Sequence, residues 1–258
     1  MKFLRFKHNN EVKVGYLSGL IITELDCNDI ISLFDKTQEE IKALSKDKYN
    51  LKNIEFLTPT DPSKIICVGL NYTDHADELE MDLPKEPIIF LKPPSSVIAR
   101  DEDIVYPEIS YELDYEGELA IVIGEQCRNV SVDSAECYIL GYTILNDVTA
   151  RDIQRKDGQW TRAKSFDTFA PIGPVVETNF DFDNVILTKV NGVIRQDSNV
   201  NKMIFSPYEI LSFISQVMTL NPGDIIATGT PSGVGQLEIG DKVEVFIEGI
   251  GILKNNVA

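Results

Sequence analysis

The chain has 258 residues, of which 41 are acidic and 24 basic, giving a formal net charge of −17. Such an excess of negative charge disfavours a nucleic-acid or anionic-membrane surface, so we expect neither as a partner. The length suits one large domain with a small appendage, and the four cysteines form no C-x-x-C pair that would indicate zinc or a disulfide framework.

The N-terminal sixty residues are predicted to form a small α/β module. The first ten residues lack the apolar segment of a signal peptide, and no run in the chain approaches the ~20 apolar residues of a membrane span, which predicts a cytoplasmic protein. Short strands are expected at 2–7 and 12–17, followed by helical spacing over 29–45. A loop rich in turn formers then separates this domain, 1–60, from the main domain, 61–258.

The main domain opens with a buried strand that ends at Gly69 and leads into a short polar helix. His75 and Glu78 fall on one face of that helix at i, i+3, where a base and its partner can act together. The alternative for this segment is an exposed polar helix with a stray histidine. The next strand ends at Lys92, for which a solvated lysine is the simplest interpretation.

Residues 113–124 are the segment around which the rest is organised. The second half is apolar at odd and even positions alike, which is typical of a strand buried on both faces. The first half places Asp114, Glu116 and Glu118 on one face, because side chains alternate along a strand. Residues two apart on a strand lie ~6.6 Å apart, so Glu116 and Glu118 can converge on one point. Ionised carboxylates that close repel unless a cation lies between them, which favours a hard divalent metal over a solvated strand with scattered acids.

The following segments can complete such a site. Another apolar strand ends at Asp147, and the helix after it places Arg151 and Gln154 on one face by i, i+3 spacing. A segment whose prolines and glycine forbid a long helix then supplies Lys164, which a rigid loop can place beside the acids. Farther on, the glycine-rich run at 228–235 lacks the G-K-[S/T] ending of a phosphate loop, so we predict no phosphate site there.

A series of motifs resembles the fumarylacetoacetate hydrolase family over about residues 65 to 257. In chain order they are G-L-N-Y-x-x-H-A-x-E, D-Y-E-G-E-L-A-I-V-I-G, L-N-D-V-T-A-R-D-I-Q, A-K-S-F-D-T-F-A-P-I-G-P, V-N-G-x-x-R-Q and P-G-D-I-I-A-T-G-T-P-S-G-V-G. They are most similar to the short acylpyruvase, oxaloacetate decarboxylase and homoprotocatechuate-pathway isomerase/decarboxylase group. The resemblance implies an α+β, mainly β fold: a mixed β-sandwich roll with a small N-terminal α/β module, usually in a homodimer.

The resemblance also implies residue roles. The implied Mg²⁺ or Mn²⁺ ligands are Glu116, Glu118 and Asp147. The implied substrate-binding residues are Arg151, Gln154 and Thr230, the last of which would meet the substrate carboxylate. The implied catalytic residues are Lys164 beside the metal and the pair His75 and Glu78, on a lid segment that orders when substrate binds.

A metal held by carboxylates suits bidentate capture of a 2-oxo acid and stabilises its enolate. That enolate serves acylpyruvate hydrolysis, oxaloacetate decarboxylation and isomerisation of 2-hydroxyhepta-2,4-diene-1,7-dioate alike. Hydrolysis of the C–C bond of an acylpyruvate is the first choice, with Glu78, polarised through His75, activating water and Lys164 stabilising developing negative charge.

Alternative functions remain open from the sequence. Within enzymes they are 2-hydroxyhepta-2,4-diene-1,7-dioate isomerase, decarboxylase acting on 5-oxopent-3-ene-1,2,5-tricarboxylate or oxaloacetate, and, more distantly, sugar-acid dehydratase. An alternative of another class is a non-catalytic metal- and ligand-binding protein. The presence of His75, Glu78 and Lys164 disfavours that class, because a mere binder needs none of them.

Overall fold

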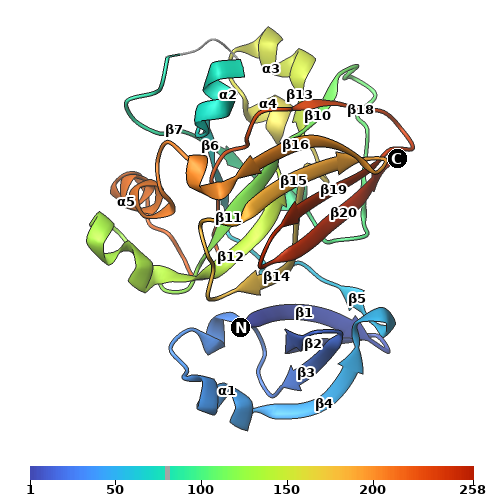
Figure 1. Ribbon diagram of the computed structural model, residues 1–258, viewed down its shortest axis with the longest axis vertical. Helices are drawn as coiled ribbons and strands as arrows, with labels where there is room; N and C mark the ends of the chain where they lie inside the picture. The colour runs from blue at the N-terminus through green and yellow to red at the C-terminus, as the bar shows by residue number, and fades with distance from the viewer. Residues whose placement is uncertain (79–81) are drawn as a thin grey trace.

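The computed structural model describes residues 1–78 and 82–258, and its fold is mainly β with short helices, as the sequence predicts (Figure 1). The largest sheet has 12 strands, ten of them in the order β4-β3-β2-β1-β14-β12-β11-β17-β6-β7, with β5 paired to β1 and β8 to β14. Their bounds are β1 Lys2–His8, β2 Glu11–Ser18, β3 Ile21–Leu25, β4 Ser45–Asn50, β5 Glu55–Phe56, β6 Ile65–Gly69, β7 Ile88–Lys92, β8 Val97–Ile98, β11 Gly117–Ile123, β12 Ile139–Asn146, β14 Ala170–Glu177 and β17 Ile225–Ala227.

Two smaller sheets complete the main body. A three-stranded sheet contains β10 Leu113–Tyr115, β13 Thr149–Ala150 and β18 Gly235–Leu237. A five-stranded sheet, with order β16-β15-β19-β20-β9, contains β9 Asp103–Ile104, β15 Val185–Val190, β16 Val193–Asn199, β19 Lys242–Ile247 and β20 Gly251–Val257. The five-stranded sheet packs over β11 and β12, which gives the main body its two-layered form (Figure 1).

The helices are short. The α-helices are α1 Gln38–Ala43, α2 Thr73–Glu78, α3 Arg151–Asp157, α4 Thr161–Lys164 and α5 Pro207–Val217. The 3₁₀ turns are η1 Ile31–Leu33, η2 Leu51–Asn53, η3 Pro94–Ser96, η4 Val132–Tyr138 and η5 Val200–Lys202. The segment 29–45, for which helical spacing is predicted, contains η1 and α1 as separate elements, because a capping box between Thr37 and Glu40 starts a new helix within it.

Strand β11 is buried on both faces, as its unbroken apolar run predicts. Leu119 and Ile121 belong to a core that includes Ile247 of β19, whereas Ala120 and Val122 belong to a second core that extends to Phe3 of β1. Because side chains of a strand alternate, one strand supplies both cores. Glu118 is carried on this fully buried element and is itself 1% exposed.

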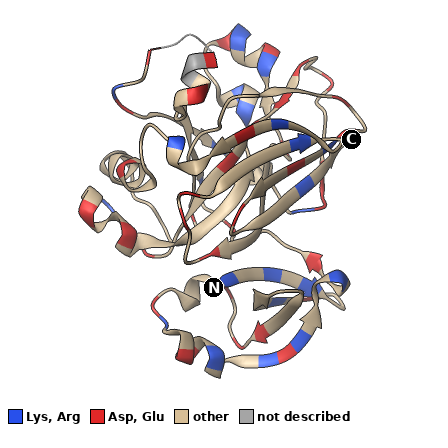
Figure 2. Ribbon diagram, viewed as in Figure 1, with Lys and Arg blue, Asp and Glu red and all other residues tan. Residues whose placement is uncertain are grey.

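The N-terminal strands continue the large sheet through β1, which pairs antiparallel with β14. In Figure 1 β1 to β5 and α1 lie beneath the main body, and the loop at residue 60 leads from them into β6. The division into domains 1–60 and 61–258 remains a prediction. None of the described helices has the length and apolar character needed to cross a membrane. Acidic and basic positions are distributed over both parts of the chain (Figure 2).

Asp224, in the turn before β17, holds separate segments together. Its carboxylate is fully buried and accepts hydrogen bonds from the backbone N–H groups of Asn221 at 2.8 Å, Ser63 at 3.0 Å and Lys64 at 3.2 Å. The Ser63 hydroxyl donates to it at 2.6 Å, and the Lys64 ammonium also pairs with it. The carboxylate therefore fixes the start of β6 beside the start of β17.

We expect Asp224→Ala to lower the free energy of unfolding by about 2–4 kcal/mol, because it leaves several buried donors without an acceptor. Urea unfolding followed by circular dichroism measures the change. Asp61→Ala is the control, since the Asp61 side chain is 80% exposed in its ion pair with Arg5 and should change stability by less than about 0.5 kcal/mol. Matching transition midpoints for the two variants would contradict the role of Asp224.

Candidate active site

The extended segment is interrupted at Glu116, where the chain passes from one sheet to another. Strand β10 pairs with β13 and β18, whereas β11 pairs with β12 and β17, so the continuous strand expected over 113–124 was wrong. At the break, the Asn146 side chain accepts from the Glu116 N–H at 3.0 Å, and the Asp147 N–H donates to the Glu116 carbonyl at 2.8 Å. A Cβ at Gly117 would lie 2.4 Å from Thr188 Oγ1, so only glycine allows this close approach.

Three carboxylates meet at this break. One ligand atom from each of Glu116, Glu118 and Asp147 lies within 4.8 Å of the others, and all three side chains are buried. The Gly229 N–H donates to Glu118 Oε2 at 2.8 Å, which fixes that side chain. The donor set consists of oxygen only, so it fits Mg²⁺ or Mn²⁺ better than zinc.

Two buried lysines contact the carboxylates. Lys164, on α4, donates to Glu116 Oε2 at 2.7 Å and to Asp147 Oδ2 at 2.6 Å. Lys92, at the end of β7, pairs with Asp147 Oδ1 and donates to the Val148 carbonyl at 3.0 Å. Lys92 is 1% exposed, so the interpretation as a solvated lysine was wrong. Residues 88–91 are apolar on both faces of β7, so the sequence pattern did not show which way Lys92 points.

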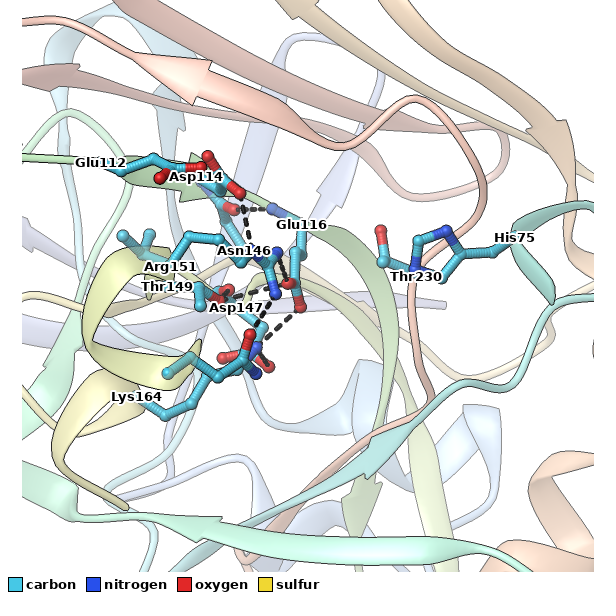
Figure 3. A network of polar contacts seen from close by, with 12 residues as sticks. His75, Glu112, Asp114, Glu116, Asn146, Asp147, Thr149, Arg151, Lys164 and Thr230 are labelled. Carbon is cyan, nitrogen blue, oxygen red and sulfur yellow. Dashed lines mark hydrogen bonds and ion pairs between the residues drawn. The ribbon is translucent and has the colours of Figure 1, made fainter. Parts of the chain in front are cut away.

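Arg151 joins the cluster from the first turn of α3. It donates to Asp114 Oδ2 at 2.7 Å through Nε and pairs with Glu116 (Figure 3). Its Nη1 donates to the Gln154 side chain. In this arrangement the guanidinium orients two of the acids as well as lining the site. Its pKa is raised, because the charges of Glu116 and Asp114 outweigh the opposing effect of burial.

The charges of the centre do not balance. When all four carboxylates are ionised, one negative charge is in excess where the acids Asp114, Glu116, Glu118 and Asp147 meet the bases Lys92, Arg151 and Lys164. A divalent cation would reverse the sign and leave one positive charge in excess, which suits an anionic substrate.

Burial and neighbouring charges move the pKa values of the acids in opposite directions. Burial by itself raises the pKa of Glu116, but the charges of Lys164 and Arg151 outweigh it and hold the pKa well below its usual range. Burial, together with the charges of Asp147 and Glu116, raises the pKa of Glu118 well above its usual range. Glu118 is therefore the carboxylate that the protein neutralises least, and a bound cation would favour its ionised form.

The loop that follows β17 closes one side of the centre. Thr230 donates its hydroxyl proton to the Gly117 carbonyl at 2.9 Å, and Gln196 Nε2 donates to Thr230 Oγ1 at 2.8 Å and to the Pro231 carbonyl at 2.9 Å. Gln196 also accepts from the Gly117 N–H at 3.0 Å and is fully buried. Sequence reasoning gave Gln196 no role, although it belongs to the V-N-G-x-x-R-Q motif, because its partners are distant in sequence.

His75 and Glu78 form the expected pair on α2. His75 Nδ1 lies 3.1 Å from Glu78 Oε2, and the Gly233 N–H donates to both Glu78 oxygens at 3.2 Å. His75 lies on the Thr230 side of the site, across from Arg151 and Lys164 (Figure 3). The Glu78 carboxylate is therefore attached to the loop, while the imidazole is the member of the pair that faces the cavity.

A cavity of about 220 Å³ brings most of the predicted residues together. The polar side chains lining it are His75, Glu116, Glu118, Arg151, Gln154, Lys164 and Thr230. The other lining residues are Val68, Gly69, Leu70, Ile88, Phe90 and Trp160. A small anionic molecule in this space would contact the acidic centre, His75 and an apolar wall at once.

Known proteins share both the sequence and this arrangement of elements. The family model described as fumarylacetoacetate (FAA) hydrolase C-terminal matches residues 64–258. Oxaloacetate tautomerase Fahd2a, mitochondrial, of Rattus norvegicus is 38% identical over 286 residues, covering 100% of this chain and 91% of the relative.

Solved structures agree over the whole chain. 2-Hydroxyhepta-2,4-diene-1,7-dioate isomerase from Mycobacterium marinum has a TM-score of 0.89 at 40% identity, covering 100% of this chain and 98% of the other. Fumarylacetoacetate hydrolase from the psychrophilic Exiguobacterium antarcticum has a TM-score of 0.90 at 35% identity, covering 100% of this chain and 99% of the other. This chain is therefore an enzyme of the fumarylacetoacetate hydrolase family.

Proposed function

We propose that the chain is a Mg²⁺- or Mn²⁺-dependent enzyme that converts 2-oxo acids through their enolates. The first candidate for the reaction that it catalyses is keto–enol proton transfer. The observation that carries the proposal is one cavity lined both by Glu116 and Glu118 of the buried three-carboxylate centre and by His75. When bound, the cation supplies positive charge to the carboxylate and keto oxygens of the substrate and so stabilises the enolate.

The residues of the chain supply the remaining parts of the reaction. Lys164 adds positive charge beside the substrate oxygens, and Arg151 with Gln154 holds the substrate in place. His75 moves the proton at C3, and Glu78 orients its imidazole. The Thr230 hydroxyl donates its proton to the Gly117 carbonyl. The substrate carboxylate therefore accepts a hydrogen bond from a backbone N–H of the same loop instead of from this hydroxyl.

Names of relatives support proton transfer as the first candidate. The rat relative is named a tautomerase and the Mycobacterium marinum neighbour an isomerase, and both reactions move a proton along a 2-oxo or 2-hydroxy acid. Acylpyruvate hydrolysis, the first choice from the sequence, is the second candidate. It is favoured by the His75–Glu78 pair and by the hydrolase from Exiguobacterium antarcticum, because a carboxylate polarised by histidine can activate water.

A substrate panel tests the proposal. Oxaloacetate, acetylpyruvate and a homoprotocatechuate-pathway dienoate are each assayed with Mg²⁺, with Mn²⁺ and with EDTA. We expect accelerated enol–keto conversion of oxaloacetate that EDTA abolishes. A metal-dependent turnover of acetylpyruvate without any tautomerisation would favour the hydrolase instead, and no turnover across the panel would remove the proposal.

Glu78→Ala separates the two candidates. If Glu78 is the base that activates water, the variant should lose acetylpyruvate hydrolysis by a factor on the order of 10² or more, whereas tautomerisation needs no attacking water and should fall less. Both rates are measured at saturating Mg²⁺. Glu86→Ala, which removes an exposed carboxylate of the same part of the chain, is the control. Equal losses in the two reactions would reject the water-base role and leave Glu78 as an orienting group.

The proposal includes a homodimer and a cytoplasmic location, both expected from the sequence. Light scattering of the purified protein gives the oligomeric state. The rat relative is named mitochondrial, so the compartment is best checked by fractionation of cells expressing this chain.

A further inference from the structure

One face of β7 leads outward from the acidic centre. Lys92, Phe90 and Ile88 share this face, since side chains two apart on a strand point the same way. Lys92 pairs with Asp147, and the Phe90 ring centroid lies 5.0 Å from Lys164 Nζ. Successive members lie ~6.6 Å apart, so the face passes from a cation through an aromatic ring to an aliphatic side chain.

Trp160 continues this apolar path across from β7. It is the only tryptophan of the chain, and its ring meets Phe90 edge to face, with centroids 5.1 Å apart at 76°. A Cβ at Gly69 would lie 2.7 Å from Trp160 Cζ3, so the indole occupies the space that the missing side chain leaves. Gly69 pairs with Ile88 in the sheet, which places the indole, Ile88 and Phe90 together.

A second and larger hollow adjoins the site cavity at these side chains. It measures about 480 Å³ and shares Ile88, Phe90 and Trp160 with the smaller one. The rest of its lining is Ile66, Ile89, Leu91, Gly158, Gln159, Thr161 and Met218, so no charged side chain of the described residues lines it. Ile88 is 47% exposed, so apolar surface on this face remains open to a ligand.

The cations of the site cavity are already engaged. Arg151 pairs with Asp114 and Glu116, and Lys164 pairs with Glu116 and Asp147. Among the described residues that line this path there is no unpaired lysine or arginine, so a second carboxylate on the far end of a substrate would gain no ion pair there. An alkyl or aryl group would instead gain about fourfold in affinity for each methylene that it buries.

We propose that Ile88, Phe90 and Trp160 form an apolar subsite for the C3 substituent of a 2-oxo acid. The substrate class is thereby 2-oxo and 2,4-dioxo acids whose far end is a hydrocarbon chain or ring, in preference to dicarboxylates of the same length. This inference rests on the proposed function, because the acidic centre must hold the 2-oxo acid end for the substituent to reach the subsite.

Binding of oxamates to the Mg²⁺-loaded protein, measured by calorimetry, tests the subsite without requiring turnover. Oxamate mimics the 2-oxo acid end, N-hexyloxamate adds an apolar chain, and N-(5-carboxypentyl)oxamate adds a chain of similar length with a terminal carboxylate. We expect N-hexyloxamate to bind at least tenfold tighter than oxamate, and the carboxylated chain to lose most of that gain. Ile88→Ser and Trp160→Ala should each reduce the ratio of the hexyl to the parent affinity severalfold.

A control and a second variant keep the outcome interpretable. Ile239→Ser, which removes an isoleucine that is 70% exposed elsewhere, should leave the ratio at its wild-type value. Gly69→Ala, which displaces the indole without removing it, should lower the ratio even if Trp160→Ala fails to fold. Equal affinities for oxamate and N-hexyloxamate would overturn the subsite while the proposed function stands. Absence of Mg²⁺-dependent oxamate binding would overturn both.

Discussion

Replacing Glu118 by Gln is expected to abolish Mg²⁺-dependent turnover and to weaken Mn²⁺ binding by a factor on the order of 10² or more. Glu118 is the carboxylate whose charge the protein neutralises least, because Lys164 and Arg151 hydrogen bond to its neighbours and it accepts only the Gly229 N–H among the described groups. A neutral amide of the same shape keeps the packing and removes the charge that attracts the cation. Calorimetric titration with Mn²⁺ and turnover of oxaloacetate give the two readouts.

The matched control is Glu125→Gln, an exposed carboxylate just beyond the other end of the same strand. It should bind Mn²⁺ and turn over substrate like the unmodified protein. Undiminished metal binding and turnover in Glu118→Gln would remove the proposed metal site, whereas intact metal binding with lost turnover would move Glu118 from metal ligand to a different part of the chemistry.

Lys164→Met is expected to lower kcat by a factor on the order of 10²–10³ with a smaller change in substrate binding, as for loss of one preorganised electrostatic group. Methionine is close to lysine in length but carries no charge, and Lys164 is 2% exposed between Glu116 and Asp147. The lysine also neutralises those carboxylates, so the Mn²⁺ affinity of the variant should persist or increase. This combination of slower turnover and retained metal separates loss of catalysis from loss of the site.

Lys48→Met serves as the control for Lys164→Met, because Lys48 is an exposed lysine of β4 in the N-terminal part of the chain. Steady-state kinetics at saturating Mg²⁺ measures kcat and KM in both variants. A kcat of Lys164→Met within threefold of the control would reject the electrostatic role.

Local pattern was sufficient for most of the elements that carry the site. The apolar run of β11 and the strand ending before Asp147 lie where the sequence places them, and S-P-Y-E at 206–209 forms the capping box that such a sequence indicates at the start of α5. The hairpin of β15 and β16 also turns at Asn191 and Gly192, both at positive φ. These features depend on neighbours within a few residues, so the sequence alone contains the information.

The features that sequence reasoning missed depend on contacts between distant segments. The break at Glu116 follows from the pairing of β10 with β13 and β18, and the burial of Lys92 follows from its contact with Asp147. Lys164 was expected on a rigid loop but lies at the end of α4, since the prolines and glycine that forbid a long helix come only after it. No local pattern distinguishes a buried lysine with a carboxylate partner from a solvated one.

Because of the interruption at Glu116, the proposed metal site lies at the junction of two sheets. Glu116 follows the last residue of β10, while Glu118 lies on β11, so one cation would be coordinated by residues on both sides of the interruption. Binding and structure are linked: if the correct spacing of the two sheets strengthens cation binding, cation binding stabilises that spacing by the same free energy. A bound cation would therefore hold the two sheets together in addition to any role in the reaction, and the stability of this junction would rise with the affinity for the metal.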